Sequence, residues 1–323
     1  MTKYVISGYI GFDNFGDEAI AEVLTSHLKK LGAEKITVIS SNPEKTSKLY
    51  DVDSCKMLDF LKPIADCDIF ISGGGSLLQD VTSLKSLLYY LALITYALAL
   101  NKKVIIFAQG FTPFRTKIGK FLTKHILKHC HKISVRDIKS QELLNKLGIE
   151  SELVTDPVYG IELDKNQNKE GVGIQLRSYH SLNDIFLNQL ADEVTKHFSN
   201  KEIKLFSLQD SLDLAPLHRF AEMLESRNIK SKIYQNLDTN KTIEELSKLE
   251  YLIGMRFHAC LVSAKAGVKT LGINYDVKVQ NLAKTVDFPS VKLDEKTLTG
   301  KFEELLNLDV NQYKIPEAKF PEI

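Results

Sequence analysis

The amino-acid sequence predicts an α/β protein built from two Rossmann-like lobes. Short apolar runs alternate with amphipathic runs along the chain, which is the pattern of βαβ units in a mainly parallel sheet. The pattern is interrupted by the polar stretch 161–170 and then starts again. A chain of 323 residues is long enough for two domains of ordinary size. We therefore expect an N-terminal lobe over residues 1–165 and a C-terminal lobe over residues 166–323, and the last helix could pack back on the N-terminal lobe.

The N-terminal lobe is expected to begin with a strand, a glycine-containing loop and a helix. Asp17 and Glu18 stand at the start of this helix, where acidic side chains interact favourably with its dipole, and Gly32 ends it. The strands predicted for this lobe are Lys3–Gly8, Lys35–Ser40, Asp68–Ser72, Lys103–Ala108 and Lys132–Val135. The helices are Asp17–Leu31, Leu84–Leu100, Lys117–His129 and Asp137–Leu147.

The C-terminal lobe repeats the alternation. Its predicted strands are Gly171–Leu176, Ile203–Ser207, Lys232–Tyr234, Tyr251–Ile253 and Lys269–Ile273. Its predicted helices are Asn183–Phe198, Leu214–Arg227, Ile243–Leu249, Phe257–Ala266, Val279–Val286 and Glu295–Leu306. In open parallel sheets, ligands bind beyond the carboxyl ends of the strands, so the residues that follow each strand are the first candidates for function.

Composition and charge exclude some classes of function. The net charge is +1, from 42 basic and 41 acidic residues, which argues against a nucleic-acid-binding protein. The four cysteines have no metal-ligand spacing, so we expect reduced thiols, no metal and a cytoplasmic location. The N-terminus lacks the long apolar region of a signal peptide. The apolar run 84–100 is too short and too interrupted for a membrane span and is expected to be a buried helix, although a membrane-facing patch is an alternative.

Three glycine-rich turns follow predicted strands of the N-terminal lobe, at residues 8–18, 72–80 and 108–113. Glycine lets the backbone approach a ligand closely, and a helix N-terminus favours anions. The spacing fits neither a dinucleotide-binding loop nor a Walker A loop. Tight turns without a ligand are the alternative for each of them.

Cationic side chains follow other strands. Arg136 follows the strand at 132–135, and Arg256 and His258 follow the strand at 251–253. Lys278 comes shortly after the strand at 269–273. Together they would supply three fixed positive charges and one titratable group to a cleft between the lobes, which suits a phosphorylated carboxylic acid. The alternatives are a salt bridge from Arg136 to Asp137, a packed histidine and a solvated lysine.

These segments occur in a characteristic order. The sequence contains GDEAI (16–20), SGGGSLLQD (72–80), AQG (108–110), SVRD (134–137), TDP (155–157), LRS (176–178), GMRFHA (254–259) and INYDVKV (273–279). In this order they resemble the polysaccharide pyruvyl transferases, over roughly residues 1 to 290, and most of all the bacterial branch that pyruvylates N-acetylmannosamine in secondary cell-wall polymers. The departures are Phe257 for leucine, Thr112 for glycine and Tyr179 for tryptophan, and the last two bear on the acceptor.

The resemblance implies a fold similar to the GT-B glycosyltransferases and a reaction in which phosphoenolpyruvate is the co-substrate and no cofactor is needed. Arg136, His258 and Lys278 match the family's motifs and would act in catalysis, with His258 as the general acid. The substrate-binding residues expected with them are Arg256, Asp17, Glu18, Gly74, Gly75, Asp80, Gln109 and Arg177. Asp17, Glu18 or Asp80 would orient the sugar hydroxyls or act as the base.

Two other function classes stay open. A nucleotide-sugar glycosyltransferase has the same architecture and would need an acidic residue for the donor ribose, for which Glu244 and Glu245 are candidates. A non-catalytic carbohydrate-binding protein is the third possibility. The partner of the enzyme would be a glycan acceptor. If that acceptor is lipid-linked, the helix at 84–100 and the basic stretch 115–132 would form a peripheral membrane surface at the inner face of the plasma membrane.

Overall fold

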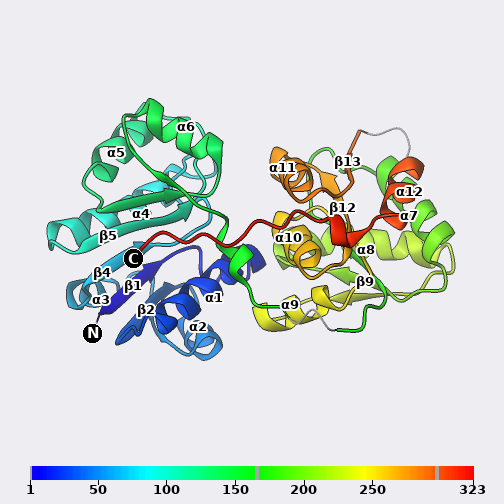
Figure 1. The fold of residues 1–323 in the computed structure, drawn as a ribbon, viewed down its shortest axis with the longest axis horizontal. Helices are drawn as coiled ribbons and strands as arrows, with labels where there is room; N and C mark the ends of the chain where they lie inside the picture. Colours follow the sequence, from blue (N-terminus) through cyan, green and yellow to red (C-terminus); the bar gives the residue numbers. More distant parts are fainter. Residues whose placement is uncertain (1, 164–166, 295–297) are drawn as a thin grey trace. The chain divides into compact units, whose positions relative to one another are not determined.

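The computed structural model describes residues 2–163, 167–294 and 298–323, and the chain divides into two compact lobes (Figure 1). The N-terminal lobe comprises the chain up to Ile161 together with the C-terminal tail Glu317–Ile323, and the C-terminal lobe runs from Glu162 to Pro316. The boundary expected between residues 165 and 166 lies outside the described residues. The expected α/β class with two Rossmann-like lobes is confirmed by two parallel sheets flanked by helices.

The N-terminal lobe contains a sheet in which every paired strand is parallel, in the order β3-β2-β1-β4-β5-β6-β7. Its strands are β1 Lys3–Ser7, β2 Lys35–Ser40, β3 Asp53–Lys56, β4 Ile69–Ser72, β5 Lys103–Gln109, β6 Lys132–Val135 and β7 Glu152–Leu153. The sequence did not predict the edge strands β3 and β7. They are short and only partly buried, so they lack the apolar run that marks the central strands.

Helices cover both faces of this sheet. They are α1 Phe15–Lys30, α2 Pro43–Tyr50, α3 Leu61–Asp66, α4 Leu84–Ala99, α5 Lys117–Leu127 and α6 Ile138–Lys146, with the short 3-10 helix η1 at Pro157–Gly160. One core is formed by the sheet with α3, α4, α5 and α6, and another by the sheet with α1 and α2. Helix α4 buries Leu87, Leu91 and Ile94, which confirms the expectation of a core helix. Among the described residues, no helix is long and apolar enough to cross a membrane.

The C-terminal lobe has a second parallel sheet, in the order β10-β9-β8-β11-β12-β13. Its strands are β8 Val172–Gln175, β9 Ile203–Phe206, β10 Ser231–Tyr234, β11 Tyr251–Gly254, β12 Lys269–Asn274 and β13 Ser290–Lys292. Its helices are α7 Asp184–Phe198, α8 Asp210–Glu225, α9 Thr239–Ser247, α10 Phe257–Lys265, α11 Val277–Val286 and α12 Thr299–Leu306, with η2 at Val310–Gln312. The last helix was predicted to start at residue 295, and residues 295–297 lie outside the described part of the chain.

Each sheet has a switch point, where strands that are neighbours in space lead to connections on opposite sides. In the N-terminal lobe it lies between β1 and β4, and in the C-terminal lobe between β8 and β11. The loops after these strands diverge and leave room for a ligand at the carboxyl edge. The turns after β1 and β4 contain Gly8 and Gly73–Gly75, and the turns after β8 and β11 contain Arg177 and His258. The topology therefore brings the predicted residues to the edge where ligands bind.

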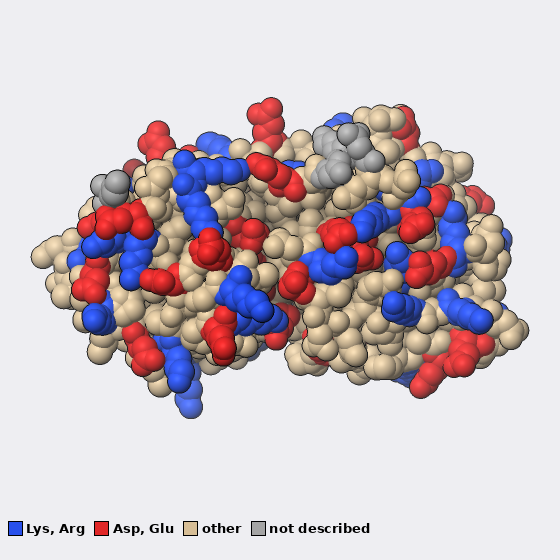
Figure 2. Space-filling view, turned by 90° about the horizontal axis from the view of Figure 1, so that it is seen from below, with Lys and Arg blue, Asp and Glu red and all other residues tan. Residues whose placement is uncertain are grey.

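Charged side chains of both signs are interspersed over the face shown in Figure 2. Neither lysine and arginine nor aspartate and glutamate dominate this face of either lobe. This mixture agrees with the net charge of +1 for the whole chain.

The segment that returns to the N-terminal lobe is the tail Glu317–Ile323, whereas α12, which we considered for this position, belongs to the C-terminal lobe. Phe320 lies against Phe107 of β5, with ring centroids 6.2 Å apart, and against His27 of α1, at 4.8 Å. The backbone N–H of Lys319 donates to Thr155 Oγ1 over 2.8 Å. The tail thus completes the apolar layer over α1 and β5.

We expect Phe320→Ala to destabilise the N-terminal lobe by about 1–3 kcal/mol, because a partly buried aromatic ring and its contacts with two elements are lost. Thermal unfolding followed by circular dichroism measures the effect. Leu58→Ala is the control, because Leu58 is 81% exposed. Equal transition midpoints for the two variants would show that the tail does not stabilise the lobe.

Candidate functional site

The carboxyl edge of the N-terminal sheet has Asp17 above the glycine turn that follows β4. Asn14 Nδ2 donates to Asp17 Oδ2 over 2.6 Å. Gly75 has φ +91°, and a Cβ at this position would lie 2.6 Å from Asp17 Oδ1. A side chain at residue 75 would therefore displace the carboxylate and strain the backbone. Gly74 packs on Ile20 of α1 in the same turn. Asp17 and the two glycines are brought together, as the sequence predicted for an acceptor site.

Glu18 lies beside this turn, but its carboxylate is used within the lobe. Its Oε1 accepts from the backbone N–H of Gly11 over 2.7 Å, and its Oε2 accepts from Tyr50 Oη over 2.5 Å. Burial raises the pKa of Glu18 above its ordinary value, although the hydrogen bonds from Tyr50 and Gly11 act in the opposite direction. Glu18 ties α1 to the first loop and to α2, which is a structural task.

Two further predicted residues also have structural partners. The carboxylate of Asp80 accepts from the backbone N–H groups of Arg115 and Thr116, each over 2.7 Å, and from Thr116 Oγ1 over 2.6 Å. Burial acts to raise the pKa of Asp80, but the hydrogen bonds from Thr116 and the two amides outweigh it, and the pKa lies below its ordinary value. Gln109 is fully buried and donates from Nε2 to Ser72 Oγ over 2.7 Å and to the Gly73 carbonyl over 2.9 Å. Asp80 fixes the start of α5, and Gln109 joins the ends of β4 and β5.

Arg136 follows β6 and is paired with a buried acid. Its Nη1 lies 2.6 Å from Asp156 Oδ2, and the side chains are 12% and 3% exposed. The alternative partner, Asp137, instead accepts from the backbone N–H and the hydroxyl of Ser140 as the N-cap of α6. A Cβ at Gly110 would lie 3.3 Å from Arg136 Nε, so this glycine leaves space for the guanidinium. The fixed charge expected from Arg136 is therefore compensated by Asp156 of the TDP segment.

In the C-terminal lobe, Arg256 is also paired. Its Nη2 lies 2.7 Å from Asp213 Oδ1 and its Nε lies 2.8 Å from Asp213 Oδ2, a bidentate geometry. Asp213 is fully buried, and Gln175 Oε1 accepts from the backbone N–H of Arg256 over 2.8 Å. This pair joins the ends of β8 and β11 to α8. The fixed positive charge expected from Arg256 is therefore balanced by a buried carboxylate.

Arg177, which follows β8, is the cation whose charge is not compensated in this way. Its Nη1 donates to Tyr275 Oη over 3.0 Å, and the guanidinium carbon lies 5.0 Å from the centre of the Tyr275 ring. Within the described residues, no partner is found for its buried Nε, and no carboxylate forms an ion pair with it. The Tyr179 ring lies edge-on to the Tyr275 ring, with the centroids 5.1 Å apart. Arg177 thus presents a positive charge at the switch point.

His258 and Lys278 lie on the turns after the neighbouring strands β11 and β12. His258 is in the first turn of α10, half-buried and edge-on to Phe257 at 4.9 Å. Arg256 is the N-cap of α10, and its side chain makes no capping hydrogen bond to that helix end. Lys278 is exposed at the start of α11, whose N-cap Asp276 accepts from the Lys278 backbone N–H over 2.8 Å. The parallel register of β8, β11 and β12 therefore brings Arg177, His258 and Lys278 to one edge.

Sequence reasoning missed Asp213 and Tyr275 as parts of this edge. Asp213 is one of several acidic residues on α8, and nothing in the local sequence marks it as the partner of Arg256, 43 residues away. Tyr275 lies within the INYDVKV segment, so the motif could have suggested it. Among the described residues, no group of histidine, cysteine and acidic side chains could bind a metal ion.

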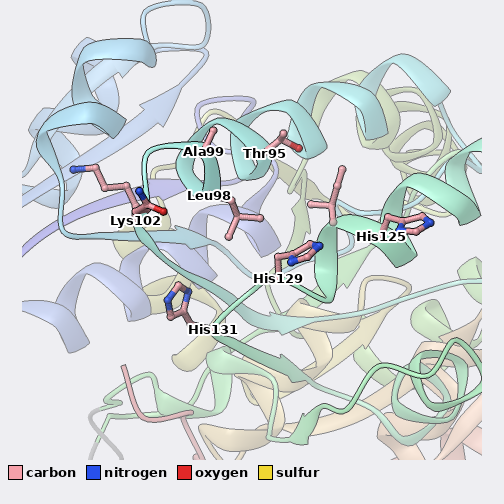
Figure 3. A pocket seen from close by; sticks show the side chains of 9 residues that line it. Thr95, Leu98, Ala99, Lys102, His125, His129 and His131 are labelled. Carbon is pink, nitrogen blue, oxygen red and sulfur yellow. The ribbon is translucent and has the colours of Figure 1, made fainter.

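A pocket of about 590 Å³ lies elsewhere, between the C-terminal ends of α4 and α5 (Figure 3). It is lined by Leu98, Lys102, Ile126, His129 and His131, among others. Lys102 and His131 precede β5 and β6, so this pocket is at the amino edge of the sheet. It is therefore on the side of the sheet opposite to the switch point.

Fold and site together define a two-lobed α/β enzyme of the GT-B type. The family model for polysaccharide pyruvyl transferases matches residues 14–277, and the chain belongs to this family of transferases of polysaccharide biosynthesis. The match contains Arg136 and His258 and ends one residue before Lys278. A search of curated proteins found no match.

Solved structures support the fold. A putative UDP-N-acetylglucosamine 2-epimerase from Listeria monocytogenes is similar with a TM-score of 0.69 and 11% identity, over 99% of this chain and 92% of that one. The UDP-GlcNAc 2-epimerase of Methanocaldococcus jannaschii gives 0.67 and 13%, over 99% and 96%. Anabaena HepE in complex with UDP and glucose gives 0.63 and 8%, over 98% and 92%. At these identities the similarity establishes the fold and not the substrate.

We expect Asp213→Asn to destabilise the C-terminal lobe by about 3–5 kcal/mol, because the buried guanidinium of Arg256 loses its counter-charge. Urea unfolding measures the change. The control is Asp184→Asn, which breaks the ion pair with Arg219 on the surface and should cost at most about 1 kcal/mol. Similar losses for the two variants would mean that the buried pair is not what stabilises this edge.

Glu18 gives a pH-dependent prediction. Its pKa is raised in the folded state, so the folded protein binds its proton more tightly than the unfolded chain does. Between the ordinary and the raised pKa the folded state carries more protons, and stability must fall as pH rises. We expect Glu18→Gln to remove this component of the slope in urea unfolding measured across that window. The exposed Glu44→Gln should keep the wild-type slope, and the same flattening in both variants would exclude Glu18 as its origin.

Proposed function

We propose that the protein transfers the enolpyruvyl group of phosphoenolpyruvate to two hydroxyls of a sugar in a cell-wall or exopolysaccharide precursor, forming a pyruvate ketal and releasing phosphate. The observation that carries this proposal is the uncompensated guanidinium of Arg177, on the same sheet edge as His258 and Lys278 in a member of this family. A ligand with both a carboxylate and a phosphate matches two cations and the N-terminus of α10.

In this proposal the C-terminal lobe binds the donor. Arg177 has a planar fork that suits a carboxylate or phosphate, and Tyr275 keeps it in place from one side. Lys278 contributes a second charge from the start of α11, and the N-terminus of α10 contributes a favourable dipole. Arg136 is assigned to the site because it matches the arginine of the family's VRD motif. Its pairing with Asp156 implies that it would act as an oriented hydrogen-bond donor with little net charge.

His258 would be the general acid. It donates a proton to the methylene carbon of phosphoenolpyruvate, and C2 becomes oxocarbenium-like. One sugar hydroxyl then forms a C–O bond to C2, the bond from C2 to the phosphate oxygen breaks, and the second hydroxyl closes the ketal. Of the two hydroxyl protons released, one restores His258 and the other leaves with phosphate. This sequence needs neither an oxidant nor a metal.

The acceptor would bind to the N-terminal lobe, with Asp17 as the carboxylate that orients its hydroxyls or removes a proton. Asp17 is the candidate that we choose because its carboxylate lies over Gly75, on the glycine turn that follows β4. The turn at Gly73–Gly75 lets a sugar approach the backbone. We further propose that the reaction takes place in the cytoplasm, as the four unpaired cysteines suggest.

The structural neighbours that bind UDP favour a second candidate, a nucleotide-sugar glycosyltransferase. Glu244 and Glu245 were the candidate ribose ligands. Both are on α9, where Glu244 pairs with Lys241 and Lys248, and Glu245 lies 3.8 Å from Lys204. Both residues are in the second half of α9, and Lys204 is at the amino end of β9. They therefore do not lie at the carboxyl edge of the sheet, and the pyruvyl transferase is the better supported function.

The decisive measurement is phosphate release from phosphoenolpyruvate with candidate acceptors, with mass measurement of the product. We expect His258→Ala to lower kcat by about 10²–10⁴-fold, because proton donation in the transition state is lost. Arg177→Ala should mainly raise the KM for phosphoenolpyruvate, because it removes ground-state binding.

His218→Ala is the matched control, since His218 is exposed on α8. Wild-type turnover by His258→Ala would refute the acid assignment. Binding of UDP-sugars without binding of phosphoenolpyruvate would favour the glycosyltransferase instead.

A further inference from the structure

We propose that the outer surface of α4 and α5 docks on an anionic lipid bilayer. The surface, called here the α4–α5 face, consists of the exposed residues of these two packed helices and the half-buried Lys124: Lys85, Leu88, Ala92, Thr95 and Ala99 of α4, and Lys117, Ile118, Lys120, Phe121, Lys124 and His125 of α5. The inference concerns an interaction surface and does not depend on the reaction proposed above.

The charge of this region is one-sided. Between Asp80 and Asp137 the sequence has ten lysines and arginines, three histidines and no acidic residue, whereas the whole chain has a net charge of +1. The face in Figure 2, in contrast, mixes both signs. The segment includes all of α4, β5, α5 and β6, and its cations have no acidic neighbour along the chain. Two of them, Lys132 and Arg136, pair in the fold with Glu152 and Asp156, and neither lies on α4 or α5. A negatively charged surface is the electrostatic complement of such a region.

Helix α5 arranges this charge beside exposed apolar side chains. Lys117, Lys120 and Lys124 follow one another at three and four residues and form one row along the helix. Ile118 and Phe121 form the adjacent row, and they are 62% and 59% exposed. The opposite side, with Gly119, Thr123 and Leu127, is buried against the lobe. A lysine row next to an exposed aliphatic and aromatic pair is typical of helices that lie in a membrane interface.

Helix α4 extends the surface with side chains that cost little to bring near lipid. From Leu88 onward its exposed positions are Leu88, Ala92, Thr95 and Ala99, which are uncharged, and Leu88 is 40% exposed. Since its other side is buried, α4 can contact a bilayer only from outside, in agreement with the absence of a spanning helix from the described residues.

The pocket at the C-terminal ends of α4 and α5 also combines polar and apolar side chains. Lys102, His125, His129 and His131 lie around the apolar side chains of Leu98 and Ile126, in a hollow of about 590 Å³ (Figure 3). A rim with one lysine and three polar imidazoles over an apolar floor suits the phosphate and glycerol groups of an anionic lipid at a membrane surface.

Vesicle sedimentation tests the proposal with the whole protein. We expect binding to vesicles of phosphatidylcholine mixed with phosphatidylglycerol, much weaker binding to phosphatidylcholine alone, and release at high salt, because anionic-lipid attraction is screened. The triple variant Lys117→Gln, Lys120→Gln, Lys124→Gln should weaken binding on the order of 100-fold, at about 1 kcal/mol per lysine. The double variant Ile118→Ser, Phe121→Ser should weaken vesicle binding but keep the salt dependence of the wild type, because it removes apolar contacts and no charge.

The matched charge control is Lys48→Gln, Lys62→Gln, Lys230→Gln, three exposed lysines outside the face, and the apolar control is Ile185→Ser, which removes a 73% exposed side chain. Circular dichroism establishes that each variant is folded. The proposal would be overturned if the control variants lost as much vesicle binding as the face variants. It would also be overturned if the protein bound equally well to vesicles with and without phosphatidylglycerol. A change of oligomeric state in light scattering without any vesicle binding would assign the face to self-association instead. Because sedimentation does not involve turnover, a failed docking test leaves the proposed reaction untouched.

Discussion

The buried carboxylate of Asp213 organises the carboxyl edge of the C-terminal sheet. It binds the guanidinium of Arg256 in a bidentate pair, and it accepts from the backbone N–H of Leu208 over 2.9 Å and from Gln175 Nε2 over 3.1 Å. It therefore connects the segments that follow β8, β9 and β11. A fully buried charge is tolerated only when it is paired and hydrogen-bonded to this extent. The turn that carries His258 begins at Arg256, so the position of the proposed acid depends on this pair.

The N-terminal lobe uses the same device. Asp156 pairs with Arg136 after β6, and Asp80 accepts three hydrogen bonds from the start of α5. In both lobes, buried acids thus fix the loops at the edge where ligands bind. As a consequence, the positive charges of Arg136 and Arg256, the arginines of the SVRD and GMRFHA motifs, are neutralised by carboxylates. Arg177 differs from them, because its hydrogen-bond partner is a tyrosine hydroxyl and not a carboxylate.

The similarity of fold and the match to a family model support conclusions of different specificity. The two-lobed architecture is similar to that of UDP-GlcNAc 2-epimerases and of HepE, at identities of 8% to 13%. Architecture of this kind serves many chemistries, and the family model is what assigns this chain to the pyruvyl transferases. The α4–α5 face adds a feature outside the sheet edges, where a run of 56 positions between Asp80 and Asp137 has only basic charges.

The sequence by itself determined the α/β class, the two lobes, the central strands and the order of the family motifs, because apolar periodicity and short motifs are local properties. It also predicted which residues follow which strand, and parallel pairing then brings Arg177, His258 and Lys278 to one edge. It missed the edge strands β3, β7 and β13, which are too short or too exposed for an apolar signal. Only the tertiary structure decided which charges are neutralised. Arg256 and Asp213 are 43 residues apart, as Arg136 and Asp156 are 20 apart, and such pairs form because burial requires a counter-charge, whatever the distance along the chain.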